Sequence, residues 1–265
     1  MRRHLASVLL LTSVFGCGGG DAEHEQPDAS AAGDDAARPD AGDDDALQGF
    51  VNLTSQTVDD QTFWGYSIYL MAPTPGGAAC YWGEPRGACC IGLAPVDAPD
   101  HLSAGTLTLE NQTTGMSGDI PWLDDQSDYG FLSPAFPWSP GDALSVSAAG
   151  DEVPAFAAST TFPSALDGLE AETVVSLSSD WTIRWTPAGA SRVVVKLFAG
   201  SHSLSCPAPD ADGELTVPAA LLDEAFDPGD GNAFIVRVSA GPAAEDPAIA
   251  LEAELSVSSP VTFAP

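Results

Sequence analysis

From residue 49 onward, large apolar side chains alternate with polar or small ones, and this period of two most limits the possible folds. The segment FWGYSIYL places Trp64, Tyr66, Ile68 and Leu70 on one side of an extended chain, and TLTLE and ALSVSA alternate in the same way. Successive side chains of a strand point to opposite faces, so the spacing predicts half-buried antiparallel strands. Turns rich in Gly and Pro separate the segments, as in APTPGG and WSPGD. The sequence therefore predicts an all-β fold.

The last part of the chain repeats this pattern more clearly. DWTIRWTP places Trp181, Ile183 and Trp185 on one face, and RVVVKLF, GELTV, AFIVRVSA and ALEAELSV follow it. About seven short strands in roughly 100 residues is the number expected of an Ig-like sandwich. We therefore expect two antiparallel β-sandwich domains, the first over residues 50–160 and the second, Ig-like one over residues 161–265.

One helix is predicted within the second domain, over residues 218–226 with the sequence PAALLDEAF. Pro218 is suited to the first turn of a helix, and Pro228-Gly229 ends it. The segment WTIRWTPAGASRVVVKLF resembles the early strands of fibronectin type III modules, in which a Trp-x-Pro strand is followed by a Val-rich strand. This resemblance also implies a sandwich, and it implies no activity.

The beginning of the chain has the order of an export signal. The basic start MRRH is followed by an apolar run of ten residues from Leu5 to Val14. This is the length of a signal peptide and is well short of the roughly 20 residues that a transmembrane helix needs. The junction Val14-Phe15-Gly16-Cys17 resembles the lipobox of bacterial lipoproteins.

The lipobox resemblance implies that the Cys17 thiol receives a diacylglyceryl group and that residues 1–16 are removed as a signal peptide. The new amino terminus would then be acylated, and several acyl chains would anchor the protein stably in a membrane lipid layer. Many Gram-negative lipoproteins that stay at the inner membrane have Asp after this cysteine, so Gly18 implies the outer membrane of the cell envelope. The alternative is an ordinary secretory signal that is cleaved near Gly16.

Residues 17–49 are predicted to be a disordered acidic tether. They contain ten acidic residues and one base, Arg38, among many Ala, Gly and Pro residues. Such a segment has too few large apolar side chains to offset the entropy of ordering. We expect it to hold the folded part away from the membrane.

The charge of the chain excludes some partners. The net charge is −30, and residues 50–265 contain 28 acidic residues against five Lys and Arg. A surface of this kind repels nucleic acid and anionic lipid headgroups and attracts cations. We therefore expect no nucleic-acid partner and membrane contact only through an acylated Cys17; any other envelope partner is unknown from the sequence.

Four further cysteines are expected to form disulfides, because an exported protein meets an oxidising compartment. Cys89 and Cys90 are adjacent, so on a strand their side chains point to opposite faces. One of the two is predicted to bond to Cys80. The other could reach Cys206 and join the two domains, whereas the alternative is that Cys206 is a buried free thiol.

Two acidic loops are candidates for weak calcium binding. DIPWLDDQSDYG contains Asp124, Asp125 and Asp128, and PAPDADGEL contains Asp210 and Asp212. The second loop starts like a calcium loop but lacks the later Glu and the flanking helices, so a turn between strands is the alternative. No other metal or cofactor is predicted.

The aromatic residues crowd the first domain, and most of them are expected in its core. Tyr81 and Trp82, in a predicted loop, and Trp122 are the candidate ligand contacts, because aromatic side chains stacked on a surface could bind sugars.

No catalytic residues are predicted, since the chain has no G-x-S-x-G elbow and neither His101 nor His202 has a recognisable partner. The sequence thus favours a membrane-anchored, surface-displayed binding or structural lipoprotein that is not an enzyme. A carbohydrate-binding module, or an extracellular polymer hydrolase that uses carboxylates of the first domain, is the alternative.

Overall fold

The computed structural model describes residues 48–58, 61–71, 84–93, 101–130, 137–242 and 248–265. All of these residues belong to one compact unit that extends from Gly42 to Pro265. They form 17 strands, one α-helix and one short 3-10 helix, which confirms the predicted all-β class.

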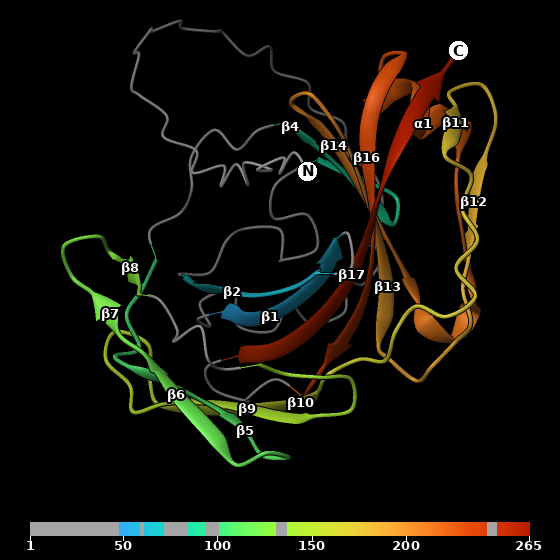
Figure 1. The fold of residues 1–265 in the computed structure, drawn as a ribbon. Coiled ribbons are helices and arrows are strands. Elements are labelled where there is room, and N and C mark those ends of the chain that lie inside the picture. Colours follow the sequence, from blue (N-terminus) through green and yellow to red (C-terminus); the bar gives the residue numbers. More distant parts are fainter. Residues whose placement is uncertain (1–47, 59–60, 72–83, 94–100, 131–136, 243–247) are drawn as a thin grey trace, which may run out of the picture. The chain divides into compact units, whose positions relative to one another are not determined.

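The largest sheet has nine strands, which come from both halves of the unit. They are β1 (Gln48–Val58), β2 (Gln61–Met71), β3 (Glu84–Arg86), β4 (Cys89–Leu93), β11 (Val174–Ser176), β13 (Arg192–Ala199), β14 (His202–Pro209), β16 (Gly229–Ala240) and β17 (Ala248–Ala264). The order is β2-β1-β17-β16-β13-β14-β4-β3, and β11 pairs with the end of β17 (Figure 1). Most neighbours are antiparallel as expected, but β1 and β11 run parallel to β17. Alternation along a strand carries no information about the direction of its neighbour, so the sequence could not reveal these two pairs.

The remaining strands form smaller sheets. A four-stranded sheet has the order β10-β9-β5-β6, with β10 (Phe156–Thr161), β9 (Ala143–Ala148), β5 (Leu107–Asn111) and β6 (Met116–Ile120); β7 (Trp122–Leu123) pairs with β8 (Asp128–Tyr129), and β12 (Trp181–Arg184) with β15 (Glu214–Val217). The helix α1 (Ala219–Ala225) follows Pro218, which confirms the helix predicted over residues 218–226. A 3-10 turn, η2 (Asp210–Asp212), precedes β15.

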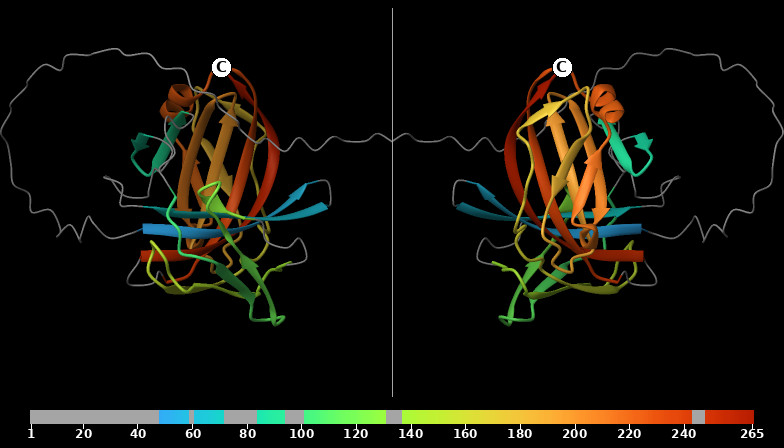
Figure 2. Two further views of the ribbon diagram at one scale, coloured as in Figure 1. Left: turned by 90° about the vertical axis from the view of Figure 1, so that its left-hand side faces the viewer. Right: turned by 90° about the vertical axis from the view of Figure 1, so that its right-hand side faces the viewer.

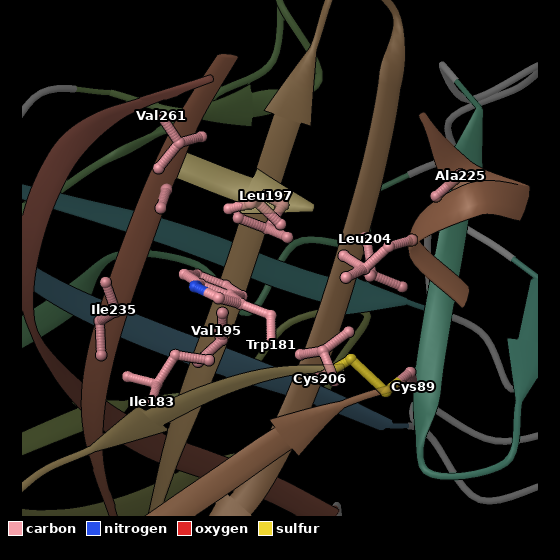
Figure 3. Close-up of a cluster of buried hydrophobic side chains, with 14 of the residues drawn as sticks. Cys89, Trp181, Ile183, Val195, Leu197, Leu204, Cys206, Ala225, Ile235 and Val261 are labelled. Atoms are coloured by element: carbon pink, nitrogen blue, oxygen red, sulfur yellow. A yellow bond between two sulfur atoms is a disulfide. The ribbon is translucent and has the colours of Figure 1, made fainter. Parts of the chain in front are cut away.

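The buried apolar side chains form two large clusters. The first cluster lies among β1, β2, the four-stranded sheet and the start of β17, and it includes Val51, Leu53, Leu107, Leu144, Ile249 and Leu251. The second cluster lies between the large sheet and the β12–β15 pair, and it includes Trp181, Ile183, Val195, Leu204, Ile235 and Val261 (Figure 3). Trp181 and Ile183 thus point inward, as their spacing predicted.

One strand, β17, contributes to both clusters. Its residues Ile249, Leu251 and Ala253 belong to the first cluster, and Val261 and Phe263 belong to the second. These are alternate residues of one strand, so both clusters lie on the same face of β17. The antiparallel pairing with β16 continues along this length, and Figure 2 shows the red β17 ribbon reaching from the blue β1–β2 pair to the orange strands.

The described strands therefore do not separate at residue 160. β4 precedes that residue but places Cys89 in the second cluster, and β17 follows it but supplies side chains to the first. Because the two clusters share one large sheet, the described strands show no boundary at residue 160. The division into sandwiches over residues 50–160 and 161–265 therefore stays a prediction.

A disulfide joins Cys89 in β4 to Cys206 in β14, with a Cα–Cα distance of 4.3 Å (Figure 3). The two strands are neighbours in the large sheet, where Ser205 lies opposite Cys90. This bond is the one that the sequence offered between the Cys89-Cys90 pair and Cys206, so Cys206 is not a free thiol. Cys90 is also disulfide-bonded. Cys80 lies outside the described residues, so its predicted bond stays a prediction.

Candidate functional site

The candidate site is the face of the β1–β2 hairpin that points away from the first cluster. Along β1, Val51 and Leu53 are buried in that cluster, whereas Asn52 and Thr54 lie on the opposite face and are half-buried. The strand alternates because only one of its faces packs against the four-stranded sheet.

Strand pairing places the side chains of this face in rows. Tyr69 lies opposite Phe50, Ser67 opposite Asn52, Gly65 opposite Thr54, and Phe63 opposite Gln56. We define the β1–β2 outer face as Phe50, Asn52, Thr54, Gln56, Phe63, Ser67 and Tyr69. None of the described residues of β1 and β2 is charged. The face consists of hydroxyl, amide and aromatic groups.

An ordered pair of salt bridges borders the outer face on β17. Glu252 lies beside Asn52 in the parallel register, and Glu254 lies beside Thr54. Arg192 donates to both carboxylate oxygens of Glu252 at 2.7 Å, and the Lys196 ammonium lies 3.7 Å from Glu254. Since β13 is separated from β17 by β16, these long side chains cross β16, where Val236 and Val238 are buried.

Aromatic and imidazole groups close one end of the face. The rings of Phe50 and Tyr69 are 4.8 Å apart, and the His101 ring contacts Tyr69 edge-on at 5.7 Å. His101 Nδ1 lies 3.3 Å from Asp128 Oδ1. His101 therefore has a carboxylate partner, which sequence reasoning missed because the two residues are 27 positions apart, His101 before β5 and Asp128 in the short strand β8. Burial raises the pKa of Tyr69 above 10.0; the hydrogen bond with Ser67 lowers it in part, and the charge of Asp128 raises it further.

The β7–β8 hairpin holds Asp128 in place. The backbone N–H of Tyr129 donates to Asp128 Oδ1 at 2.7 Å, and the Tyr129 hydroxyl accepts a hydrogen bond from Ala104 N at 2.8 Å. Trp122, a predicted ligand contact, is half-buried and packs edge-on against Tyr129 at 5.1 Å. Its ring thus supports the hairpin beside the site. Tyr81 and Trp82, the other predicted contacts, lie outside the described residues.

One acceptor on the outer face has no hydrogen-bond partner among the described residues. Asn52 Oδ1 is buried, and no donor reaches it. Buried polar atoms are almost always paired, so an orphaned one needs an explanation. Gly65 lies diagonally across from Asn52, and a Cβ built there would come within 3.0 Å of Thr54 Oγ1, so a side chain at this position would press on the Thr54 hydroxyl.

All Lys and Arg side chains in the described ranges form ion pairs. Arg86 pairs with Glu84 and Glu224, Arg184 with Glu214, Arg192 with Glu252, Lys196 with Glu254, and Arg237 with Asp210. The same ranges contain 22 Asp and Glu against these five bases, which leaves a net charge of −17. The β1–β2 outer face is thus an uncharged surface on an acidic body, as are the paired strands β9 and β10.

The predicted calcium ligands are dispersed. Asp124 and Asp125 are exposed in the turn between β7 and β8, while Asp128 is engaged by His101 and Tyr129. Asp212 is exposed at the end of η2. Within the part of the chain that the structure describes, no group of three or more His, Cys, Asp or Glu side chains is arranged to hold a metal ion.

Asp210 has a structural role, which favours the turn alternative over calcium binding for its loop. Its side chain is fully buried and accepts a hydrogen bond from Arg237 Nε at 3.0 Å, with Arg237 equally buried. The second carboxylate oxygen accepts hydrogen bonds from Ala188 N at 2.7 Å and Ala190 N at 3.1 Å. Both oxygens are therefore occupied by the protein itself.

Arg237 was not singled out by sequence reasoning, although it lies in the apolar segment AFIVRVSA. Its guanidinium also donates to the carbonyl oxygens of Thr186, at 2.5 Å, and of Ala165. In the register of the hairpin it lies opposite Leu255, between Ala253 of the first cluster and Val257 beside the second. The buried ion pair thus lies where the two clusters meet. An arginine on the inward-facing side of an otherwise apolar strand was the available signal.

Comparisons with known proteins identify no relatives: no family model matches the chain, and no curated protein sequence is significantly similar to it. In the described part of the chain, no helix has the length and apolar character needed to cross a membrane. Cys17 and the segment before it lie outside the described residues.

Proposed function

We propose that this protein is a membrane-anchored, non-catalytic binding lipoprotein of the cell envelope, and that its ligand contacts the β1–β2 outer face. The observation that carries the binding role is a neutral, hydrogen-bonding face with aromatic groups on a body whose described residues have a net charge of −17. A charged surface is kept soluble by hydration and self-repulsion, so an uncharged face with aromatic groups is where such a body can approach a partner most easily.

The junction Val14-Phe15-Gly16-Cys17 supports lipid anchoring, and Gly18 supports the outer membrane as its address. Electrostatics supports the need for an anchor as well. The described body has a net charge of −17, and its Lys and Arg side chains are already paired, so anionic lipid headgroups repel it. Acyl chains on Cys17 would overcome that repulsion.

The contacts of the most reactive side chains favour binding over catalysis. His101 is directed at Asp128 and Tyr69, and Tyr69 interacts with Ser67, so these groups order one another. Glu252 and Glu254, the carboxylates nearest the outer face, are each held by a cation. Weak calcium binding by Asp124 and Asp125 stays a prediction.

Lipid anchoring is tested by expressing the full chain and its Cys17→Ser variant in a host with lipoprotein processing. The wild-type protein should fractionate with the outer membrane and incorporate labelled palmitate. The variant should be soluble or unprocessed and should carry no label. A wild-type protein that is soluble and unlabelled, and whose mature amino terminus is not acylated, would contradict the proposal of lipid anchoring.

The non-catalytic role is tested by screening the protein for turnover of glycans and esters, with Asp128→Asn as the matched variant. We expect no turnover above the background of the variant. Turnover that disappears in Asp128→Asn, or in a variant of Glu252 or Glu254, would replace the proposal with an extracellular polymer hydrolase.

A further inference from the structure

The geometry points to an uncharged polysaccharide as the ligand of the β1–β2 outer face. We infer that Asn52, Thr54, Gln56 and Ser67 hydrogen-bond its sugar hydroxyls while Tyr69 and Phe50 contact a ring face. The inference rests on the proposed function, because it names the ligand class of the same site.

The first argument is the arrangement of donors and acceptors. Asn52 and Ser67 lie side by side on paired strands, and Thr54 and Gln56 follow along β1 on the same face. Neighbouring strands are about 4.8 Å apart, and alternate residues of one strand about 7 Å apart. Two amides and two hydroxyls at these intervals offer both donors and acceptors over an extended area. Sugar hydroxyls, which also donate and accept, recur along a polysaccharide at intervals of a few ångströms.

The second argument is the unpaired acceptor. Asn52 Oδ1 receives no hydrogen bond from the described residues. The atom is buried, so a ligand hydroxyl that displaces the side chains covering it would supply the hydrogen bond that it lacks. A hydroxyl is a small donor that carries no charge, and Thr54 and Ser67 are close enough in the register to bind the next hydroxyls of the same ring.

The third argument is the aromatic end of the face. The Phe50 and Tyr69 rings are 4.8 Å apart at a tilt of 37°, and His101 holds the edge of Tyr69. An aromatic ring presents an apolar face with negative partial charge, which suits the C–H groups on one side of a sugar ring. Because Tyr69 also interacts with Ser67, its orientation is fixed before a ligand binds, which reduces the ordering cost of binding.

Charge selects among polysaccharides. Glu252 and Glu254 border the face, and their cations Arg192 and Lys196 are engaged with them rather than free for an anionic ligand. With a net charge of −17 on the described body, an acidic polysaccharide would be repelled during approach. A neutral one meets no such barrier, and its binding should depend little on ionic strength.

The experiment is affinity electrophoresis of the detergent-solubilised full-length protein in native gels. The gels contain a neutral polysaccharide (galactomannan, a β-glucan, xylan or dextran) or an anionic one (polygalacturonate or alginate). We expect retardation by at least one neutral polysaccharide and by neither anionic one. Tyr69→Ala, Asn52→Ala and Thr54→Ala should each weaken the apparent affinity by more than tenfold. Thr182→Ala is the matched control, since Thr182 lies on the distant β12 and pairs its hydroxyl with Thr216 at 2.9 Å; this variant should bind like the wild type.

Thermal unfolding of each variant shows whether it is folded. If Tyr69→Ala is not folded, the test rests on Asn52→Ala and Thr54→Ala, and Tyr69→Phe, which keeps the ring, should bind like the wild type. The inference is overturned by no retardation with any neutral polysaccharide, by retardation that the three variants leave unchanged, or by selective retardation with the anionic ones. A concentration-dependent dimer that these variants abolish would instead assign the face to a second copy of the chain. None of these results bears on the anchor, which the Cys17→Ser fractionation tests separately. Release of reducing ends from a bound polysaccharide would overturn the non-catalytic proposal while supporting the site.

Discussion

The two hydrophobic clusters share one face of the β16–β17 hairpin, but different covalent and polar contacts stabilise them. The second cluster contains the Cys89–Cys206 disulfide and ends at the buried Arg237–Asp210 pair. In the described part of the first cluster, the buried polar contact is the hydrogen bond from Asn111 Nδ2 to Asp142 Oδ2 at 2.8 Å. The disulfide thus belongs to the second cluster and the buried ion pair to its border with the first, while the candidate binding face lies on β1 and β2, behind the first cluster.

This difference indicates which part of the unit should open first. A buried charge pair is costly to break, because the remaining charge stays without a partner, and a disulfide limits the freedom of the unfolded chain. Neutral hydrogen bonds contribute less. We therefore expect the second cluster to determine global stability, and the first to respond more to local changes and to ligands on β1 and β2.

The largest effect is expected from Arg237→Met, which leaves Asp210 charged and buried among backbone groups. Loss of one partner of such a pair should lower the free energy of unfolding by about 3–5 kcal/mol. Arg184→Met is the control, because Arg184 forms an exposed pair with Glu214 at 3.3 Å and should cost at most about 1 kcal/mol. Urea denaturation of the purified protein measures both. Equal effects of the two variants would remove the basis for treating the buried pair as the link between the clusters.

The next effect is expected from the double variant Cys89→Ala/Cys206→Ala. The bond closes a loop with a sequence separation of 117 residues, and a disulfide of this kind stabilises a domain by about 2–4 kcal/mol. The urea midpoint should fall accordingly, and fluorescence of Trp181 in the second cluster should report the transition. A loss below about 0.5 kcal/mol would show that β4 is held to β14 by strand pairing alone.

A smaller effect is expected in the first cluster from Asn111→Ala. Asn111 Oδ1 also accepts hydrogen bonds from Thr113 N and Thr114 N at 3.1 Å. The variant therefore removes one of the two hydrogen bonds to the buried Asp142, which keeps the one from Ser139 N at 2.8 Å, and leaves the turn after β5 without its acceptor. The cost should be about 1–3 kcal/mol. The control is Thr108→Ala, also in β5, which removes an exposed hydrogen bond to Asp119 in β6 and should cost less than about 0.5 kcal/mol. Hydrogen exchange should show that Asn111→Ala lowers amide protection in β5, β6 and β9. An equal loss of protection in β12 and β15 would contradict the expectation that the two clusters open separately.

The sequence predicted the faces of strands better than their partners. The inward set of DWTIRWTP is buried as expected, because one strand's alternation depends only on which side is covered. The parallel pairing of β1 with β17 and the sharing of β17 between clusters depend on contacts between segments about 200 residues apart, which no local pattern contains. The same reason hid the Cys89–Cys206 bond among open alternatives.

The candidate site was predictable only in kind. An aromatic excess in the first domain pointed to ligand contacts, but Trp122 supports a hairpin, and the half-buried Tyr69 and His101 form one end of the candidate site. The β7–β8 hairpin places Asp128 beside His101, and no local pattern of the sequence indicates this contact. Asp210 resembled the start of a calcium loop because both structures need an acidic residue before a turn. In the folded protein its carboxylate is occupied by Arg237 and by backbone N–H groups.

The smallest effect is expected at high pH, from Tyr129 beside the first cluster and Tyr69 on the outer face of β1–β2. Burial raises the pKa of both Tyr69 and Tyr129 above 10.0 in the folded protein. In the unfolded chain these phenols ionise near pH 10, while in the folded protein they still hold their protons. Stability should therefore be constant below the unfolded pKa and should fall as the pH rises from there through the folded pKa, because the unfolded state releases protons first. Urea denaturation between about pH 8 and 11 should show this decline, and it should be reduced in the Tyr69→Phe/Tyr129→Phe variant. An unchanged decline in that variant would mean that other groups destabilise the protein at high pH, and that the first cluster is no more sensitive to it than the second.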